Sequence, residues 1–227
     1  MRTICESIAA GIALIVLSPL LALIAVTVKF SDGGPIFYSH PRIGQNFKPF
    51  RLLKFRSMID GADRQGSITV AGDSRTTAVG RLLRRYKLDE LPQLINILEG
   101  KMQFVGPRPE VSLYVALFRD EYAILLKDRP GITDPASISY RHEEKMLDGP
   151  AAEEKYRSQI LPDKLRISLA YQQRRTLLSD LAIILRTIFP TRDNHSTASV
   201  AHTNKSSAVR TSKNQRTPLP NSAKAND

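Results

Sequence analysis

The chain has 227 residues, enough for one domain with a buried core and additional segments. Its net charge of +11 predicts an anionic partner, namely nucleic acid, acidic lipid headgroups or a phosphorylated substrate. The single cysteine, Cys5, excludes an intramolecular disulfide framework and a cysteine-based zinc site, which fits a reducing compartment.

The N-terminal segment contains 21 uncharged residues from Ile8 to Val28, mostly Ile, Leu, Ala and Val. A helix of that length is ~32 Å long, enough to cross the hydrocarbon core of a bilayer. Pro19 lies near its middle and removes a backbone donor, so we expect a bend there, with the Ser18 hydroxyl bonding the freed carbonyl. The segment is therefore either a kinked spanning helix or a re-entrant hairpin whose two ends return to one face.

Two short elements with basic residues follow. Residues 33–35 form a Gly-Gly-Pro turn before an apolar run, and a strand is predicted around residues 53–56. Its alternation places Lys54 and Arg56 on one face and Phe55 on the other. That face is either a solvated basic strand or a binding surface for phosphates.

A helix is predicted from Ala78 to Lys87, apolar on one side and basic on the other. Such a helix suits a membrane surface with anionic lipid, or packs on the domain with its basic face in water.

Asp89 and Glu90 follow this helix directly. An Asp can act as a nucleophile towards phosphorus, and a neighbouring Glu can hold a divalent ion. Alternatively Asp89 is the N-cap of a helix in which Pro92 needs no N–H, and the two interpretations are compatible because a helix N-terminus attracts phosphate. We expect the basic neighbours to keep Asp89 ionised. Arg108 lies between two prolines, which hold a forked phosphate donor in a stiff backbone.

The remainder of the chain is predicted to be mainly helical, with one helix over residues 110–127 and a long helical region, in one or two pieces, over residues 163–189. A Pro-Gly turn falls between them at residues 129–133. Residues 191–227 are rich in Ser, Thr, Asn and Lys and are predicted to be a disordered basic tail.

The run from Leu88 to Met102, followed by Val105-Gly106-Pro107-Arg108-Pro109, resembles the central signature of the bacterial sugar transferases, the monotopic polyprenyl-phosphate phosphoglycosyl transferases. Further blocks of the chain are similar to the same family. They are the spacing of Arg2, Glu6 and Ser18-Pro19, the Arg42-Ile43-Gly44 and Lys54-Phe55-Arg56-Ser57-Met58 runs, and Pro130-Gly131-Ile132-Thr133 with the later Arg141. The chain departs from the family pattern at Thr3, Glu6, His40 and residues 134–137.

The resemblance implies an enzyme that transfers a hexose 1-phosphate from a UDP-sugar to polyprenyl (undecaprenyl) phosphate and starts surface glycan synthesis. It implies that Asp89 forms a covalent phosphosugar intermediate, that Glu90 holds Mg²⁺, and that Arg108 neutralises the transferred group. It further implies phosphate binding by Lys54, Arg56 and Arg84. The candidates on the nucleotide side are Arg42, Arg129, Gly131, Thr133 and Arg141.

The fold implied is a mostly helical α+β domain with short strands and interfacial amphipathic helices. Residues 1–30 are expected to be a re-entrant membrane anchor broken at Ser18-Pro19. Residues 31–190 are expected to be the catalytic domain, on the cytoplasmic face of the bacterial inner membrane. Membrane lipid is an expected partner, and homodimerisation stays open.

Two other functions compete with this one. The first is a catalytically idle membrane scaffold of the same fold, against which the intact pair of carboxylates and Arg108 argue. The second is a membrane-tethered nucleic-acid-binding protein, suggested by the charge. The chain has no Trp and no zinc or helix-turn-helix pattern, so no nucleic-acid partner is expected. The identity of the sugar stays open.

Overall fold

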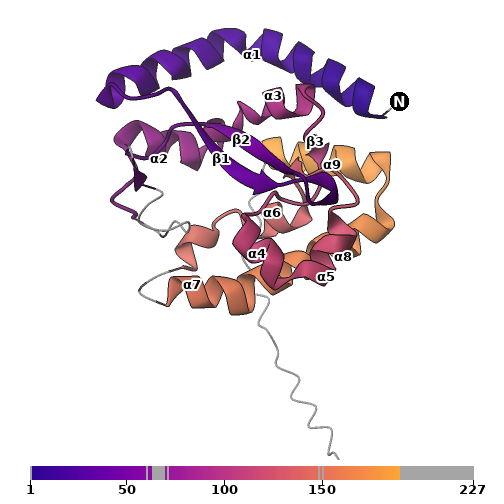
Figure 1. Ribbon diagram of the computed structural model, residues 1–227. Coiled ribbons are helices and arrows are strands. Elements are labelled where there is room, and N and C mark those ends of the chain that lie inside the picture. The colour runs from indigo at the N-terminus through magenta and orange to yellow at the C-terminus, as the bar shows by residue number, and fades with distance from the viewer. Residues whose placement is uncertain are drawn as a thin grey trace, which may run out of the picture. The chain divides into compact units, whose positions relative to one another are not determined.

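The computed structural model describes residues 2–59, 61–62, 70, 72–147, 149 and 151–189 (Figure 1). The tail predicted for residues 191–227 lies outside them. The longer helices are α1 (Arg2–Asp32), α2 (Ala78–Arg85), α8 (Leu161–Arg174) and α9 (Leu177–Ile188). The shorter helices are α3 (Gln93–Leu98), α4 (Ser112–Leu117), α5 (Arg119–Leu125), α6 (Pro135–Ser139) and α7 (Ala152–Lys155). The strands are β1 (Phe37–Ile43), β2 (Pro49–Phe55), β3 (Gln103–Val105) and β4 (Gly131–Thr133). The remaining helical turns are η1 (Gln45–Phe47), η3 (Leu88–Glu90), η4 (Glu143–Lys145) and η5 (Tyr156–Ile160). The predicted mostly helical α+β fold is confirmed.

The strands form two small sheets. β1 and β2 make an antiparallel hairpin, with Phe37 opposite Phe55 at one end and Ile43 opposite Pro49 at the other. The strand predicted around Lys54 is therefore confirmed. β3 and β4 pair in parallel, with Gln103 opposite Gly131.

α1 is one continuous helix through Ser18 and Pro19. Pro19 lacks the N–H that would bond the Ile15 carbonyl four residues earlier. The Ser18 hydroxyl donates to that same carbonyl at 2.8 Å, as expected, and so compensates for the missing bond. The structure shows the apolar N-terminal helix and does not show it as a hairpin.

α1 lies along the rest of the domain and contacts it at both ends (Figure 1). Near its N-terminus Arg2 bonds Asp180 of α9. At its C-terminus Asp32 bonds Arg56, just after β2. Between them one face buries Ala10 and Val28 in the domain core. The opposite face is apolar and exposed, through Ile4, Ile8, Ile12, Ile15, Val16, Leu23, Val26 and Phe30.

The C-terminal half supplies a second core. Tyr114 and Tyr122, from α4 and α5, pack with Tyr156 and Leu161. The helix predicted for residues 110–127 is in fact two helices, because Phe118 leaves the helical backbone conformation (φ −124°, ψ 47°) and packs against this core. The predicted region over residues 163–189 is likewise two helices, α8 and α9.

Candidate active site

Asp89 and Glu90 lie in the turn between α2 and α3. After α2 ends, Lys87 adopts a left-handed backbone conformation (φ 58°, ψ 22°), and the η3 turn follows. Both carboxylates are buried. α3 begins after Pro92 and has no side-chain cap, so Asp89 is not its N-cap and the capping alternative is excluded.

Glu90 is held between two cations. One of its oxygens, Oε1, accepts from Lys54 Nζ at 3.0 Å and from Arg108 Nη2 at 2.8 Å. Burial raises the pKa of Glu90, but Arg108, Lys54 and other nearby cations outweigh it and hold that pKa well below its usual range. Glu90 raises the pKa of Arg108 in turn. The turn, β2 and the Pro-Arg-Pro loop after β3 therefore meet at one ionised carboxylate.

Asn96 of α3 fixes β2 beside this turn. Its Oδ1 accepts from the Leu53 N–H and its Nδ2 donates to the Arg51 carbonyl, both at 3.0 Å. The side chain is fully buried. Because Lys54 is the next residue of β2, this clamp sets where its ammonium meets Glu90.

Asp89 differs from its neighbour. Its Oδ1 is buried and has no hydrogen-bond partner among the described residues. Burial raises the pKa of Asp89, and Lys54 and Arg84 only partly oppose that effect. The basic neighbours therefore offset the desolvation of Asp89 only in part, and the expectation that they keep Asp89 ionised stays a prediction. A buried oxygen without a partner needs an explanation, and a ligand at Asp89 supplies one.

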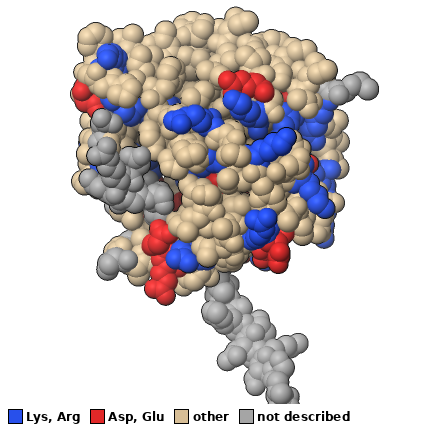
Figure 2. All heavy atoms as spheres, in the orientation of Figure 1, with Lys and Arg blue, Asp and Glu red and all other residues tan. Residues whose placement is uncertain are grey.

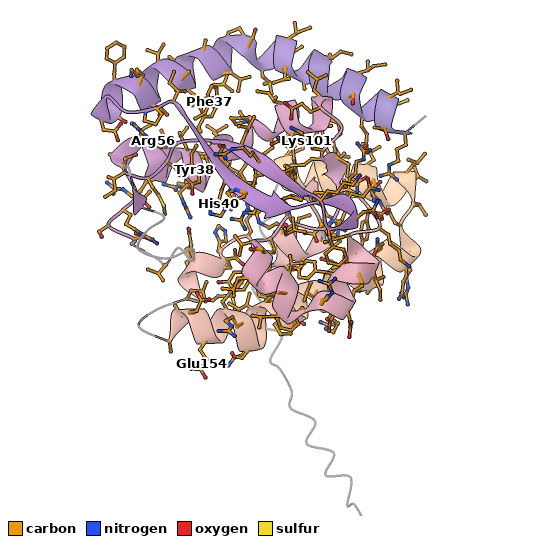
Figure 3. All side chains as sticks on the ribbon, viewed as in Figure 1. Phe37, Tyr38, His40, Arg56, Lys101 and Glu154 are labelled. Atoms are coloured by element: carbon orange, nitrogen blue, oxygen red, sulfur yellow. The ribbon has the colours of Figure 1, made fainter. Side chains whose placement is uncertain are left out.

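A cavity of about 520 Å³ lies over Asp89 and Glu90. That volume is within the ~300–1,000 Å³ usual for small-molecule sites. Phe37, Tyr38 and His40, which follow one another along β1, contribute to its lining, and Arg56 lies beneath the C-terminal end of α1 (Figure 3).

Six predicted cations line this cavity: Arg42, Lys54, Arg56, Arg84, Arg108 and Arg141. Each has a protein partner. Besides the Glu90 pairs and the Arg56–Asp32 pair, Arg42 bonds Glu110 at 3.2 Å, Arg84 lies 3.7 Å from Glu144, and Arg141 donates to the Thr187 carbonyl at 3.2 Å.

The other three predicted residues lie outside the cavity lining. Arg129 donates to the Glu6 carboxylate at 2.6 Å and to the Met102 carbonyl at 3.0 Å, so it ties α1 to the start of β3. Gly131 packs directly against the backbone of Gly106, where a side chain has no room. Thr133 shares a hydrogen bond of 2.7 Å with the Thr187 hydroxyl.

The structure also adds residues that the sequence did not single out. Glu110, Tyr156 and Lys87 line the cavity. Glu110 is buried and accepts from the Tyr156 hydroxyl at 2.8 Å as well as from Arg42. The position of Glu110 directly after the Pro-Arg-Pro motif was a sequence feature that could have indicated its place in the site. Tyr156 comes from the distant η5 turn, and no local pattern indicated it.

The site fits a hard divalent ion shared with a substrate. No group of three or more His, Cys, Asp or Glu able to hold a metal occurs in the described part of the chain. Mg²⁺ usually takes one or two protein carboxylates and completes its shell with phosphate oxygens and water. Glu90 is ionised and Asp89 has an unbonded oxygen, so this pair meets the protein's share of that requirement.

Comparison with known proteins agrees with the geometry. The family described as bacterial sugar transferase matches residues 1–192. The exopolysaccharide production protein ExoY of Rhizobium meliloti is 37% identical over 199 residues, which cover 81% of each chain. The UDP-glucose:undecaprenyl-phosphate glucose-1-phosphate transferase of Caulobacter vibrioides is 35% identical over 193 residues, 82% of this chain and 68% of that one. The Escherichia coli enzyme of the same name is 34% identical over 81% of this chain and 38% of its own length.

Proposed function

The chain belongs to the bacterial sugar transferase family, and we propose that it transfers a hexose 1-phosphate from a UDP-sugar to undecaprenyl phosphate, releasing UMP and starting exopolysaccharide synthesis. The observation that carries the proposal is the buried Asp89-Glu90 pair at the base of a cation-lined cavity. The names of the relatives supply the two substrates.

The reaction proceeds in two displacements at one phosphorus. An Asp89 oxygen attacks the β-phosphorus of the UDP-sugar, the bond to the bridging oxygen breaks, and UMP leaves with that electron pair. An oxygen of the lipid phosphate then attacks the phosphorus of the phosphoryl-aspartate, and Asp89 leaves as a carboxylate. The chain neither gains nor loses a proton. A covalent intermediate lets one site serve a soluble donor and a membrane-bound acceptor in turn.

The cations around the pair position and neutralise the phosphates. Arg108 is held by Glu90 and by its flanking prolines, so its fork is aimed at the transferred group. Lys54 reaches the same carboxylate from β2. Arg84, at the end of α2, is the candidate for the lipid phosphate. Glu90 would hold Mg²⁺, which supplies charge neutralisation on the diphosphate.

We place the protein on one leaflet of the inner membrane, with the cavity facing the cytoplasm where UDP-sugars are available. Both ends of α1 bond the same domain, through Arg2 with Asp180 and through Asp32 with Arg56. A helix tied to one domain at both ends is difficult to reconcile with a span that crosses the bilayer, which favours a monotopic or re-entrant anchor. Figure 2 shows mainly uncharged surface along α1 at the top of the view, with Lys and Arg side chains gathered below it. Apolar surface beside basic side chains suits an anionic bilayer.

UMP release by the detergent-purified protein tests this function. We expect release with Mg²⁺ and one member of a panel of UDP-sugars, increasing when undecaprenyl phosphate is added. An absence of release with every UDP-sugar would contradict the proposal. Tags at the two ends of α1 that are labelled from opposite sides of the membrane would contradict the monotopic placement.

A further inference from the structure

Lys87 belongs to the turn that carries the two carboxylates and lies two residues before Asp89, between α2 and η3. It is exposed and lines the cavity. Its backbone is left-handed, with φ 58°. That conformation disfavours a residue with a side chain, and such strain concentrates at functional sites.

Lys87 differs from the other cations of the cavity in having no ion pair or hydrogen bond from its side chain within the described residues. Each of the six cations named above forms an ion pair with a carboxylate or a hydrogen bond to a backbone carbonyl. Arg75, which also lines the cavity, bonds Asp73 at 2.6 Å. Lys87 therefore has its donors available for a ligand.

The position of Lys87 allows it to meet an anion in the cavity. Lys87 is exposed and lines the cavity, so its ammonium can reach a ligand there without breaking a contact within the described residues. A hydrogen bond from an ammonium to a phosphate is charge-assisted and is about twice as strong as one between neutral groups.

Among the described Lys and Arg residues that line the cavity, Lys87 is the one whose side chain has no ion pair or hydrogen bond. Asp89 and Glu90 carry up to two negative charges, and Lys54 and Arg108 both bond Glu90. An anionic Asp89 that attacks an anionic phosphate needs a further positive charge close to the phosphorus.

We propose that the Lys87 ammonium binds the non-bridging oxygens of the phosphoryl group that Asp89 attacks, and so acts as a catalytic residue in both displacements. The inference rests on the proposed function and adds to it a residue outside the expected set of phosphate ligands. During the first displacement, negative charge moves from Asp89 to the transferred group, and Lys87 is placed to stabilise it there.

Lys87→Gly separates the side chain from the backbone, because glycine adopts φ 58° without strain. The variant should unfold at or above the wild-type temperature, while single-turnover UMP release falls by about 10²–10³-fold, the usual effect of losing one oxyanion donor. Lys87→Arg should keep the rate within about tenfold, because it retains the positive charge. Methylamine should partly restore the Lys87→Gly rate. Lys101→Met removes an exposed lysine paired with Glu99 and should leave the rate unchanged.

Binding of inorganic pyrophosphate with Mg²⁺, measured by calorimetry, decides the inference even where no donor sugar turns over. We expect affinity about tenfold weaker in Lys87→Gly than in the wild-type protein, as for the loss of one charge-assisted contact. Equal pyrophosphate affinity, or wild-type UMP release by Lys87→Gly, would overturn the role of Lys87. Absence of UMP release by the wild-type protein would instead count against the proposed function.

Discussion

Asn96→Ala is expected to destabilise the domain and to disturb the site through β2. The side chain is fully buried, and its two hydrogen bonds of 3.0 Å join α3 to the Leu53 N–H and the Arg51 carbonyl. Each bond contributes about 1 kcal/mol net, and a buried backbone group left without a partner costs about 1–3 kcal/mol. Because the Arg51 side of β2 is exposed, water will replace one of the lost bonds in part, so we expect a total loss of about 2–4 kcal/mol.

Thermal unfolding followed by far-UV circular dichroism measures this loss, since the chain has no Trp for fluorescence. For a domain of this size the loss corresponds to a fall of about 5–15 °C in unfolding temperature. Gln45→Ala is the matched control, because it removes an exposed hydrogen bond of 2.8 Å that the side-chain amide of Gln45 donates to the Lys127 carbonyl. That control should change stability by no more than about 0.5 kcal/mol. If Asn96→Ala unfolds within about 2 °C of the wild type, the claim that the Asn96 hydrogen bonds stabilise the packing of β2 on α3 is refuted, given how unfolding temperature scales with domain size.

Three further predictions concern other parts of the fold and site. Gly131→Ala should destabilise the domain by about 1–3 kcal/mol or more, because the added Cβ would collide with the backbone of Gly106. The KM of the folded variant for the UDP-sugar should change little. A Gly131→Ala protein of normal stability and raised KM would point to a nucleotide contact instead. Burial, then the hydrogen bond to Asp163, raises the pKa of Tyr140 to about 12, so the folded state keeps this proton after the unfolded state has lost it. The free energy of unfolding should therefore fall as pH rises from about 10 towards 12, as measured by chemical denaturation. It should fall less steeply in Tyr140→Phe, and an equal dependence on pH in both proteins would contradict the raised pKa of Tyr140. Arg108→Ala should lower the rate of UMP release by about 10²–10³-fold, because it also leaves Glu90 with one cation fewer, and a change below about threefold would remove Arg108 from the site.

Local patterns in the sequence were enough to predict several elements. The amphipathic run after residue 78 predicted α2 to within two residues. The alternation around Lys54 predicted the C-terminal part of β2, and the structure shows that Lys54 lines the cavity. The freed carbonyl beside Pro19 and its hydroxyl partner were also predicted, because both depend only on residues within one helical turn.

Contacts between distant segments were beyond the reach of these patterns. β3 and β4 have three residues each and are separated by residues 106–130, so neither strand is long enough to show a periodicity in the sequence. The ion pair between Asp32 and Arg56 depends on where α1 ends relative to β2. It makes Arg56 a partner of α1, which a phosphate ligand would have to displace.

The site residues predicted from the central motif lie together in the structure, whereas a residue predicted from a more distant segment does not join them. Asp89, Glu90 and Arg108 come together as the resemblance implied. Arg129 does not join them, because Glu6 of α1 and a β3-side carbonyl take its donors. The resemblance concerns the segment, and only the tertiary contacts determine which way each side chain of that segment faces.

Intact-protein and peptide mass spectrometry after a single turnover tests the central claim most directly. The protein is mixed with the active UDP-sugar and Mg²⁺ without lipid acceptor and quenched with acid. The account predicts a mass increase of one hexose phosphate on the peptide that contains Asp89, its disappearance when undecaprenyl phosphate is added, and its absence in Asp89→Asn. UMP released in stoichiometric amount with no adduct on that peptide, or full turnover by Asp89→Asn, would contradict it.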